Sequence, residues 1–90
     1  MSLTQLRSFV VVAEEGNVTR AARRLRLSQP PLTRQLRALE DELGAPLFAR
    51  TPKGVTLLRT GEALLAHARE ILARVDAAAA AVADAMGATS

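Results

Sequence analysis

The segment from residue 28 to residue 43 carries side chains that suit contact with phosphate groups and base edges. It reads SQPPLTRQLRALEDEL. At about 100° per residue, Pro30, Arg34 and Arg37 share one face of a helix, with Thr33 on its flank. The planar guanidinium forks of the two arginines match phosphates and the edge of guanine. The alternative for this face is an ordinary solvated helix surface.

The opposite face of this segment is apolar and would anchor the helix in a core. Its leucines recur at spacings of four, three and four, at Leu32, Leu36, Leu39 and Leu43. Ser28 is expected to be the N-cap, with a hydroxyl that can accept a bond from an amide of the first turn. Pro30 and Pro31 suit that first turn, because a missing N–H costs nothing there.

Positive charge is concentrated in this part of the chain. The formal net charge of the 90 residues is only +3. Between Gly16 and Leu39 there is no Asp or Glu, whereas six arginines lie there: Arg20, Arg23, Arg24, Arg26, Arg34 and Arg37. Such a segment flanked by acids predicts a basic patch rather than a diffuse excess of charge. Arg20, Arg23 and Arg24 either reach a nucleic-acid backbone or only solvate the outer face of their helix.

Two further helices are expected before this segment. The first begins near Ser2 or Thr4 and ends at Gly16, which can take the left-handed C′ position. Asn17 then caps the second, and Arg26-Leu27 forms a short turn before Ser28. Two helices joined by such a turn, the second with basic outward residues, predict a helix-turn-helix, although the usual glycine of the turn is absent.

A basic hairpin is expected after the third helix. Residues 47–50 and 55–58 are short strand candidates, and the turn between them contains Pro52 and Gly54. Its tip carries Lys53, with Arg50 beside it. In this position the hairpin predicts the wing of a winged helix, which places a cation against phosphate or in the minor groove. The alternative is that both cations only keep the loop soluble and bind nothing.

From Thr60 onward the sequence predicts one long helix with a heptad seam. The seam residues proposed for dimerisation are Leu64, Ala68, Ile71, Leu72, Val75, Ala79 and Val82. A helix of this length leaves an apolar face that a small domain cannot cover, so we expect a homodimer through it. The alternative is that the helix folds back on the core, and its first turns are expected to do both.

Other function classes find little support. The chain has no cysteine, which excludes disulfides and thiolate metal sites and suits a cytoplasmic protein. No signal segment and no membrane span is expected. His67, the single histidine, is expected on the surface of the long helix, and no nucleophilic constellation or phosphate-binding loop is present. We therefore expect no enzyme, no metal and no cofactor. A module that binds only protein is the other alternative.

The sequence resembles the N-terminal DNA-binding domain of LysR-type bacterial transcriptional regulators from Leu3 to about Met86. The residues that carry the resemblance are Ala21-Ala22, Leu25, Ser28-Gln29-Pro30-Pro31, Leu39-Glu40, Gly44, Leu47-Phe48, Arg50 and Gly54. The two prolines are similar to those of a Ser-Gln-Pro-Pro subgroup that regulates aromatic or chloroaromatic breakdown.

The resemblance implies a mainly α fold, a winged helix-turn-helix with a two-stranded wing, that dimerises through antiparallel linker helices. It implies double-stranded DNA with an interrupted inverted repeat as the partner, and no small-molecule effector for these 90 residues. Its site residues would be Gln29, Pro30, Pro31, Thr33 and Arg34 at bases or phosphates, Arg37 and Ser28 at the backbone, and Arg50 and Lys53 in the wing.

The resemblance also implies a division of the chain and shows one departure from the family pattern. Residues 1–58 would form the winged helix-turn-helix and residues 59–90 the linker helix, while the large effector-binding domain of the family is absent. Many relatives begin the linker helix with Leu-Thr-x-x-Gly, whereas this chain reads Leu57-Leu58-Arg59-Thr60-Gly61. We therefore expect the helix cap to move to Thr60.

Overall fold

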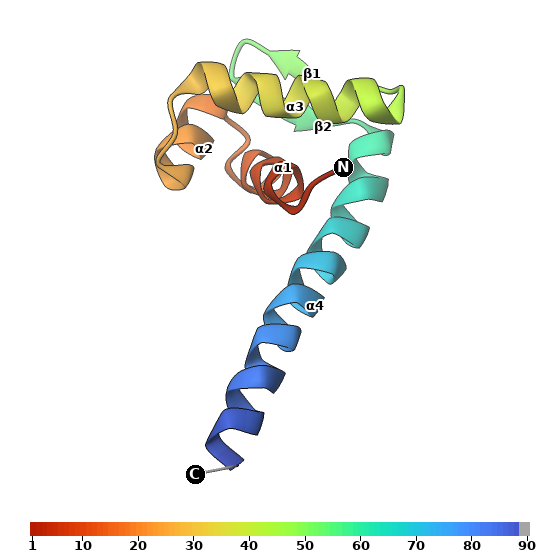
Figure 1. Ribbon diagram of the computed structural model, residues 1–90. Helices are drawn as coiled ribbons and strands as arrows, with labels where there is room; N and C mark the ends of the chain where they lie inside the picture. The colour runs from red at the N-terminus through yellow and green to blue at the C-terminus, as the bar shows by residue number, and fades with distance from the viewer. Residues whose placement is uncertain (89–90) are drawn as a thin grey trace.

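Residues 1–88, which the computed structural model describes, form a small helical body from which one long helix projects (Figure 1). The mainly α winged helix-turn-helix predicted from the sequence is confirmed. In chain order the elements are α1 (Leu3–Glu15), α2 (Val18–Leu25), α3 (Gln29–Leu43), β1 (Phe48–Thr51), β2 (Gly54–Leu57) and α4 (Arg59–Ala88).

The first two helices begin and end where their capping residues predict. Ser2 caps α1 in a capping box with Gln5, and Gly16 closes that helix with a left-handed φ of 65°. The Asn17 side chain accepts a hydrogen bond from the Arg20 amide at the start of α2. These local bonds fix the chain reversal between α1 and α2. The wing hydrogen-bonds to this reversal at Gly16.

The turn between α2 and α3 works without a glycine. Arg26 itself takes the left-handed conformation, with φ 57° and ψ 41°. Its amide and that of Leu27 bond to the last carbonyls of α2, so these carbonyls are satisfied as in a glycine-closed helix. A non-glycine residue in this conformation costs roughly 1–2 kcal/mol, which the packed helices on either side must offset.

The core lies where α1, α2 and α3 meet under the hairpin. Phe9 and Leu39 are fully buried, and the Phe9 ring lies 5.4 Å from that of Phe48. Ala21 and Ala22 are also buried, and their small side chains allow α2 to pack closely against its neighbours. The core therefore fixes the orientation of α3 from one side only and leaves its other face in solvent.

The last turn of α3 departs from the sequence prediction. Leu32, Leu36 and Leu39 are buried as predicted, but Leu43 is 41% exposed. The core ends before the last turn of α3, so the fourth leucine of the stripe has no partner there. It borders an apolar groove together with Leu64 and Ile71 of α4.

The hairpin docks on the body through backbone hydrogen bonds and through Phe48, Val55 and Leu57, which pack against the core. β1 and β2 are antiparallel, Phe48 faces Leu57 and Thr51 faces Gly54, so each strand is shifted by one residue toward the turn relative to the predicted bounds. The Val55 amide donates to the Gly16 carbonyl at 3.0 Å, and the Leu58 amide donates to the Leu47 carbonyl at 2.9 Å. The first bond holds the wing beside the start of α2, and the second closes the base of the hairpin.

The fourth helix begins at Arg59, one residue before the start at Thr60 that the heptad pattern predicts. Thr60 is not its cap, because the Thr60 hydroxyl donates instead to the Pro46 carbonyl. The Glu62 amide bonds to the Leu58 carbonyl at 2.9 Å, which places Leu58 at the N-cap position. Gly61 touches Leu47, whose carbonyl oxygen would lie 2.3 Å from an added Cβ.

An ion-pair network joins three helices at the surface. Arg24 on α2 lies 2.8 Å from Glu14 and 3.3 Å from Glu15, and Arg69 on α4 lies 3.4 Å from Glu14. The hydrogen bond from Arg24 is the main cause of a lowered pKa of Glu14, opposed by a smaller effect of desolvation. Arg24 therefore forms ion pairs with α1. The sequence alone left open whether Arg24 contacts a nucleic-acid backbone or only solvates its helix.

The lowered pKa of Glu14 predicts an acid-dependent contribution to stability. A carboxylate with a depressed pKa in the folded state stabilises the fold above its unfolded pKa, near 4.5, and loses that effect as the pH falls through the folded value. Glu14→Gln should therefore lower the melting temperature slightly above about pH 5, with the difference vanishing in stronger acid. Thermal unfolding followed by circular dichroism measures this. Glu70→Gln on α4 is the control, and an equal effect of both variants at every pH would contradict the prediction.

Within the described residues, no helix is long and apolar enough to cross a membrane.

Candidate nucleic-acid interface

The first turn of α3 contains Pro30 and Pro31, which leave the hydroxyl of the N-cap residue without a capping partner. Ser28 is the N-cap residue by position, but its side chain makes no capping bond. An N-cap hydroxyl bonds the second or third amide of the helix, and here these residues are Pro30 and Pro31, which have no N–H. The predicted capping bond of Ser28 is therefore wrong, and its exposed hydroxyl remains available to a ligand.

Gln29 is held by the preceding helix. Its Nε2 atom donates a hydrogen bond to Oγ1 of Thr19 on α2 at 2.8 Å. Both side chains are exposed. Thr19 is absent from the residues predicted from the sequence, because nothing in a spacing of ten residues indicates that the two side chains meet.

The two arginines of α3 lie on its solvent face, as the leucine stripe predicts. Arg34 and Arg37 are exposed and Thr33 is half-buried. Among the described residues neither guanidinium forms an ion pair, and the same holds for Arg50 and Lys53 on the hairpin. This contrasts with Arg24, which two glutamates neutralise. Among the described residues, α3 and the wing therefore carry four cations that no carboxylate neutralises.

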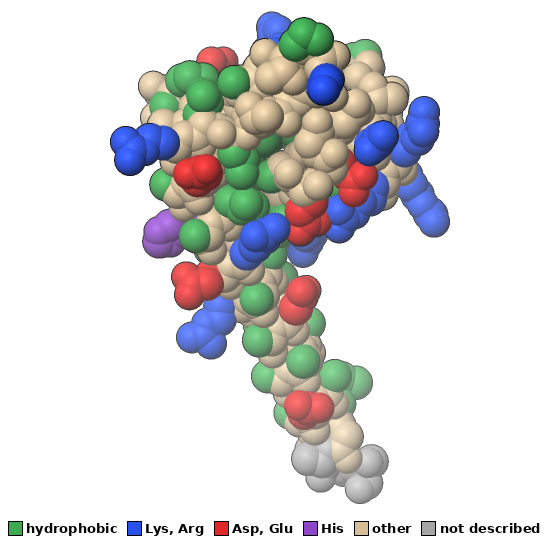
Figure 2. Space-filling view, turned by 180° about the vertical axis from the view of Figure 1, so that it is seen from behind, with side chains coloured by type: hydrophobic (Ala, Val, Ile, Leu, Met, Phe, Trp, Pro, Cys, Tyr) green, Lys and Arg blue, Asp and Glu red, His purple; other side chains and the backbone are tan. Residues whose placement is uncertain are grey.

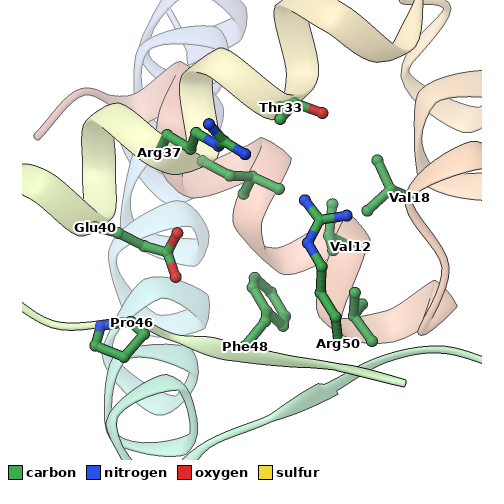
Figure 3. Close-up of a pocket in the computed structure, with 10 residues that line it drawn as sticks. Val12, Val18, Thr33, Arg37, Glu40, Pro46, Phe48 and Arg50 are labelled. Atoms are coloured by element: carbon green, nitrogen blue, oxygen red, sulfur yellow. The ribbon is translucent and has the colours of Figure 1, made fainter. Parts of the chain in front are cut away.

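A hollow of about 260 Å³ separates α3 from the wing. Figure 3 shows Arg37 entering it from α3 and Arg50 entering it from β1, with Thr33 at its rim. Its floor is apolar and includes Phe48. At the far end Glu40 accepts a hydrogen bond from the Leu47 amide at 2.7 Å, which ties α3 to the chain that leads into the wing.

A second hollow, of about 270 Å³, lies between the start of α2, the start of α3 and the turn of the wing. Thr19 and Gln29 line one side of it, and Arg50 and Lys53 line the other. The two hollows share Arg50, so cationic and hydrogen-bonding groups follow one continuous path from α3 to the wing. Guanidinium, ammonium and hydroxyl groups arranged in this way suit the phosphates of a polynucleotide strand.

The long helix carries a different kind of surface. Seen from behind, the projecting part of the molecule shows hydrophobic side chains in the open, while many Lys and Arg side chains lie over the body (Figure 2). Ala68 is fully buried by its own chain and Leu72 packs against the core. Farther along, Val82 is 62% exposed. The first turns of α4 thus belong to the core, as expected, and Ala68 is not accessible to a second copy.

The order of elements, the turn between α2 and α3 and the docked hairpin define a winged helix-turn-helix protein. The profile of the family described as "Bacterial regulatory helix-turn-helix protein, lysR family" matches residues 3–62. The chain belongs to this family.

Relatives of known name agree with this assignment. ClcR of Pseudomonas putida is 56% identical over 72 residues, which are 80% of this chain and 24% of ClcR. BudR of Klebsiella aerogenes is 53% identical over 78 residues, which are 87% of this chain and 54% of BudR. Both are named HTH-type transcriptional regulators, in agreement with the expectation that the chain is not an enzyme. The chain spans about a quarter of the length of ClcR.

Solved structures show the same fold. The DNA-binding domain of CbnR, in a complex with DNA, has a TM-score of 0.89 and 44% identity, and the match covers 94% of this chain and 98% of that one. The DNA-binding domain of BenM, in a complex with catB site 1 DNA, has a TM-score of 0.90 and 38% identity, with 93% and 94% covered.

Proposed function

We propose that this chain binds double-stranded DNA sequence-specifically as a homodimer and forms the DNA-binding part of a bacterial LysR-type transcriptional regulator. The observation that carries the proposal is the surface of α3 and the wing, where exposed cations without ion-pair partners adjoin the amide of Gln29. Solved complexes of the CbnR and BenM domains with DNA support it.

In this proposal α3 enters the major groove and the wing lies at the neighbouring minor groove or backbone. Gln29 and Arg34 contact base edges, since amide and guanidinium groups can bond adenine and guanine with two hydrogen bonds each. The other contacts go to phosphates or to the sides of the groove. They are assigned to Ser28, Pro30, Pro31, Thr33, Arg37, Arg50 and Lys53.

The dimer is proposed from the apolar face of α4. This face is buried at Ala68 by the chain itself, but it continues past the body through Val75, Ala79 and Val82. No other described residue covers this distal part. A second copy of α4 would bury it, and the groove bordered by Leu43, Leu64 and Ile71 extends the same apolar surface. An antiparallel pair would set two copies of α3 about one helical turn of DNA apart.

The pathway that such a regulator controls and its place in the cell are proposed from similarity alone. The Ser28-Gln29-Pro30-Pro31 run supports a place among regulators of aromatic or chloroaromatic breakdown, and a bacterial regulator of DNA would work in the cytoplasm. Relatives with other names, such as BudR, match almost as well as ClcR. Identifying the promoters that the chain binds would therefore decide whether it belongs to the subgroup that regulates aromatic or chloroaromatic breakdown.

Selection of binders from a randomised duplex library with the purified chain tests the proposed function. The expected result is an enriched, interrupted inverted repeat. Retention without any enriched motif would show DNA binding that lacks specificity. No retention even at low salt would remove the DNA-binding proposal and favour a module that binds protein.

Arg34→Ala is expected to weaken binding to the selected duplex by about 1–3 kcal/mol and to relax preference at one base pair of each half-site. The cause is loss of a guanidinium that reads a base edge. Fluorescence anisotropy on the duplex and its single-base variants measures both effects. Arg74→Ala on α4 is the matched control, since its guanidinium is exposed far from α3. A uniform loss across all duplexes would instead make Arg34 a phosphate contact.

A further inference from the structure

The hydrogen bond between Thr19 and Gln29 links two helices at the surface proposed to read DNA. Thr19 is the second residue of α2, where Asn17 already provides the cap by bonding the Arg20 amide. The Thr19 hydroxyl is therefore not needed to close the helix. It accepts instead from Nε2 of Gln29 at 2.8 Å, across the turn between the two helices.

We propose that Thr19 is a positioning residue that sets the base preference of Gln29. This inference rests on the proposed DNA-binding function. A glutamine reads adenine through its oxygen and one N–H, while its amide carries two N–H groups. Thr19 occupies one N–H and leaves the oxygen and the other N–H for a base. The bond thus fixes the amide without competing for the groups that read the base.

The geometry around Gln29 makes this restraint necessary. Gln29 is exposed at the first position of α3, so burial does not restrict the torsions of its long side chain. Among the described residues the bond to Thr19 is the only side-chain hydrogen bond of Gln29. Preorganisation of a flexible side chain reduces the entropy lost on binding, and it favours the one base that fits the fixed orientation.

Thr19 also lines the hollow that contains Arg50 and Lys53, so a direct contact with phosphate is the competing role for its hydroxyl. The two roles differ in what they change. A positioning residue changes discrimination among bases at one pair, whereas a phosphate contact from an uncharged hydroxyl changes affinity for all sequences alike.

Gln29→Ala first identifies the base pair at which discrimination depends on Gln29. The test then measures the affinity of the Thr19→Ala and Thr19→Ser chains for the selected duplex and for duplexes with each of the other bases at that pair. A two-bond contact discriminates by about 5- to 150-fold. Thr19→Ala is expected to lower that discrimination at least about threefold, with discrimination at the other pairs unchanged. Thr19→Ser should retain it, because the hydroxyl remains.

Controls separate the inference from the function on which it rests. In a Gln29→Ala background, Thr19→Ala should have no further effect on discrimination. Unchanged discrimination in Thr19→Ala, or a uniform loss of affinity across all duplexes, would overturn the positioning role while DNA binding stands. Failure of the unmodified chain to prefer any sequence would overturn the proposed function itself, and the positioning role with it. Circular dichroism checks that each variant is folded.

Discussion

The double substitution Val75→Glu with Val82→Glu is expected to lower the affinity of the chain for the inverted repeat by about 10²–10⁴-fold. The two positions lie seven residues apart on the face of α4 that leaves the body, and Val82 is 62% exposed in the single chain. In a dimer this face would become buried, and carboxylates buried without partners cost several kcal/mol. The dimer would dissociate, and each half-site would be bound by a separate chain.

The matched control places the same two charges on the opposite face. Ala73→Glu with Ala80→Glu keeps the spacing of seven and the net charge, and both positions are exposed. Sedimentation equilibrium gives the oligomeric state, and anisotropy titration gives the affinity. If the valine variant remains dimeric, or if both double variants lose affinity equally, the proposed interface is wrong.

The second large effect is expected for Gly54→Ala in the wing. Gly54 has φ 144°, which L-residues rarely adopt, and an added Cβ would lie 2.2 Å from the Gly16 carbonyl oxygen. Overpacking costs about 1–3 kcal/mol, to which about 1–3 kcal/mol of backbone strain is added. The wing would have to move away from α1, and the bond between the Val55 amide and Gly16 would be lost.

Gly44→Ala is the control that separates backbone strain from the steric clash of an added Cβ. Gly44 also has a positive φ, of 71°, but an added Cβ meets nothing within 4 Å, so only the conformational cost of roughly 1–2 kcal/mol is expected. Urea unfolding followed by circular dichroism compares the two variants. Equal midpoints would show that the contact between Gly54 and Gly16 does not hold the wing in place.

Local patterns predict most of this fold. Gly44 closes α3 with a left-handed φ, as Gly16 closes α1. These glycines, the caps Ser2 and Asn17 and the hairpin turn each act within a few residues, so the sequence indicates them directly. The leucine stripe correctly assigns the buried and exposed faces of α3 up to Leu39. The missing capping bond of Ser28 was also predictable, since the two amides that it would bond belong to prolines.

Features that depend on distant contacts could not be predicted in this way. Leu43 is exposed because the core ends before it, and a helical period does not show where a core ends. Thr60 bonds to Pro46 rather than capping α4, and Arg24 pairs with Glu14 ten residues earlier. Thr60 and Arg24 each have two possible partners, and only the packing of the helices decides between them.

The most direct measurement is the dissociation constant of the purified chain for the selected duplex, compared with duplexes in which one or both half-sites are scrambled. We expect tight binding to the intact repeat, weaker binding to one half-site, and salt-sensitive residual binding to the fully scrambled duplex, because phosphate contacts remain there. Equal dissociation constants for all three duplexes would contradict sequence-specific binding by a dimer.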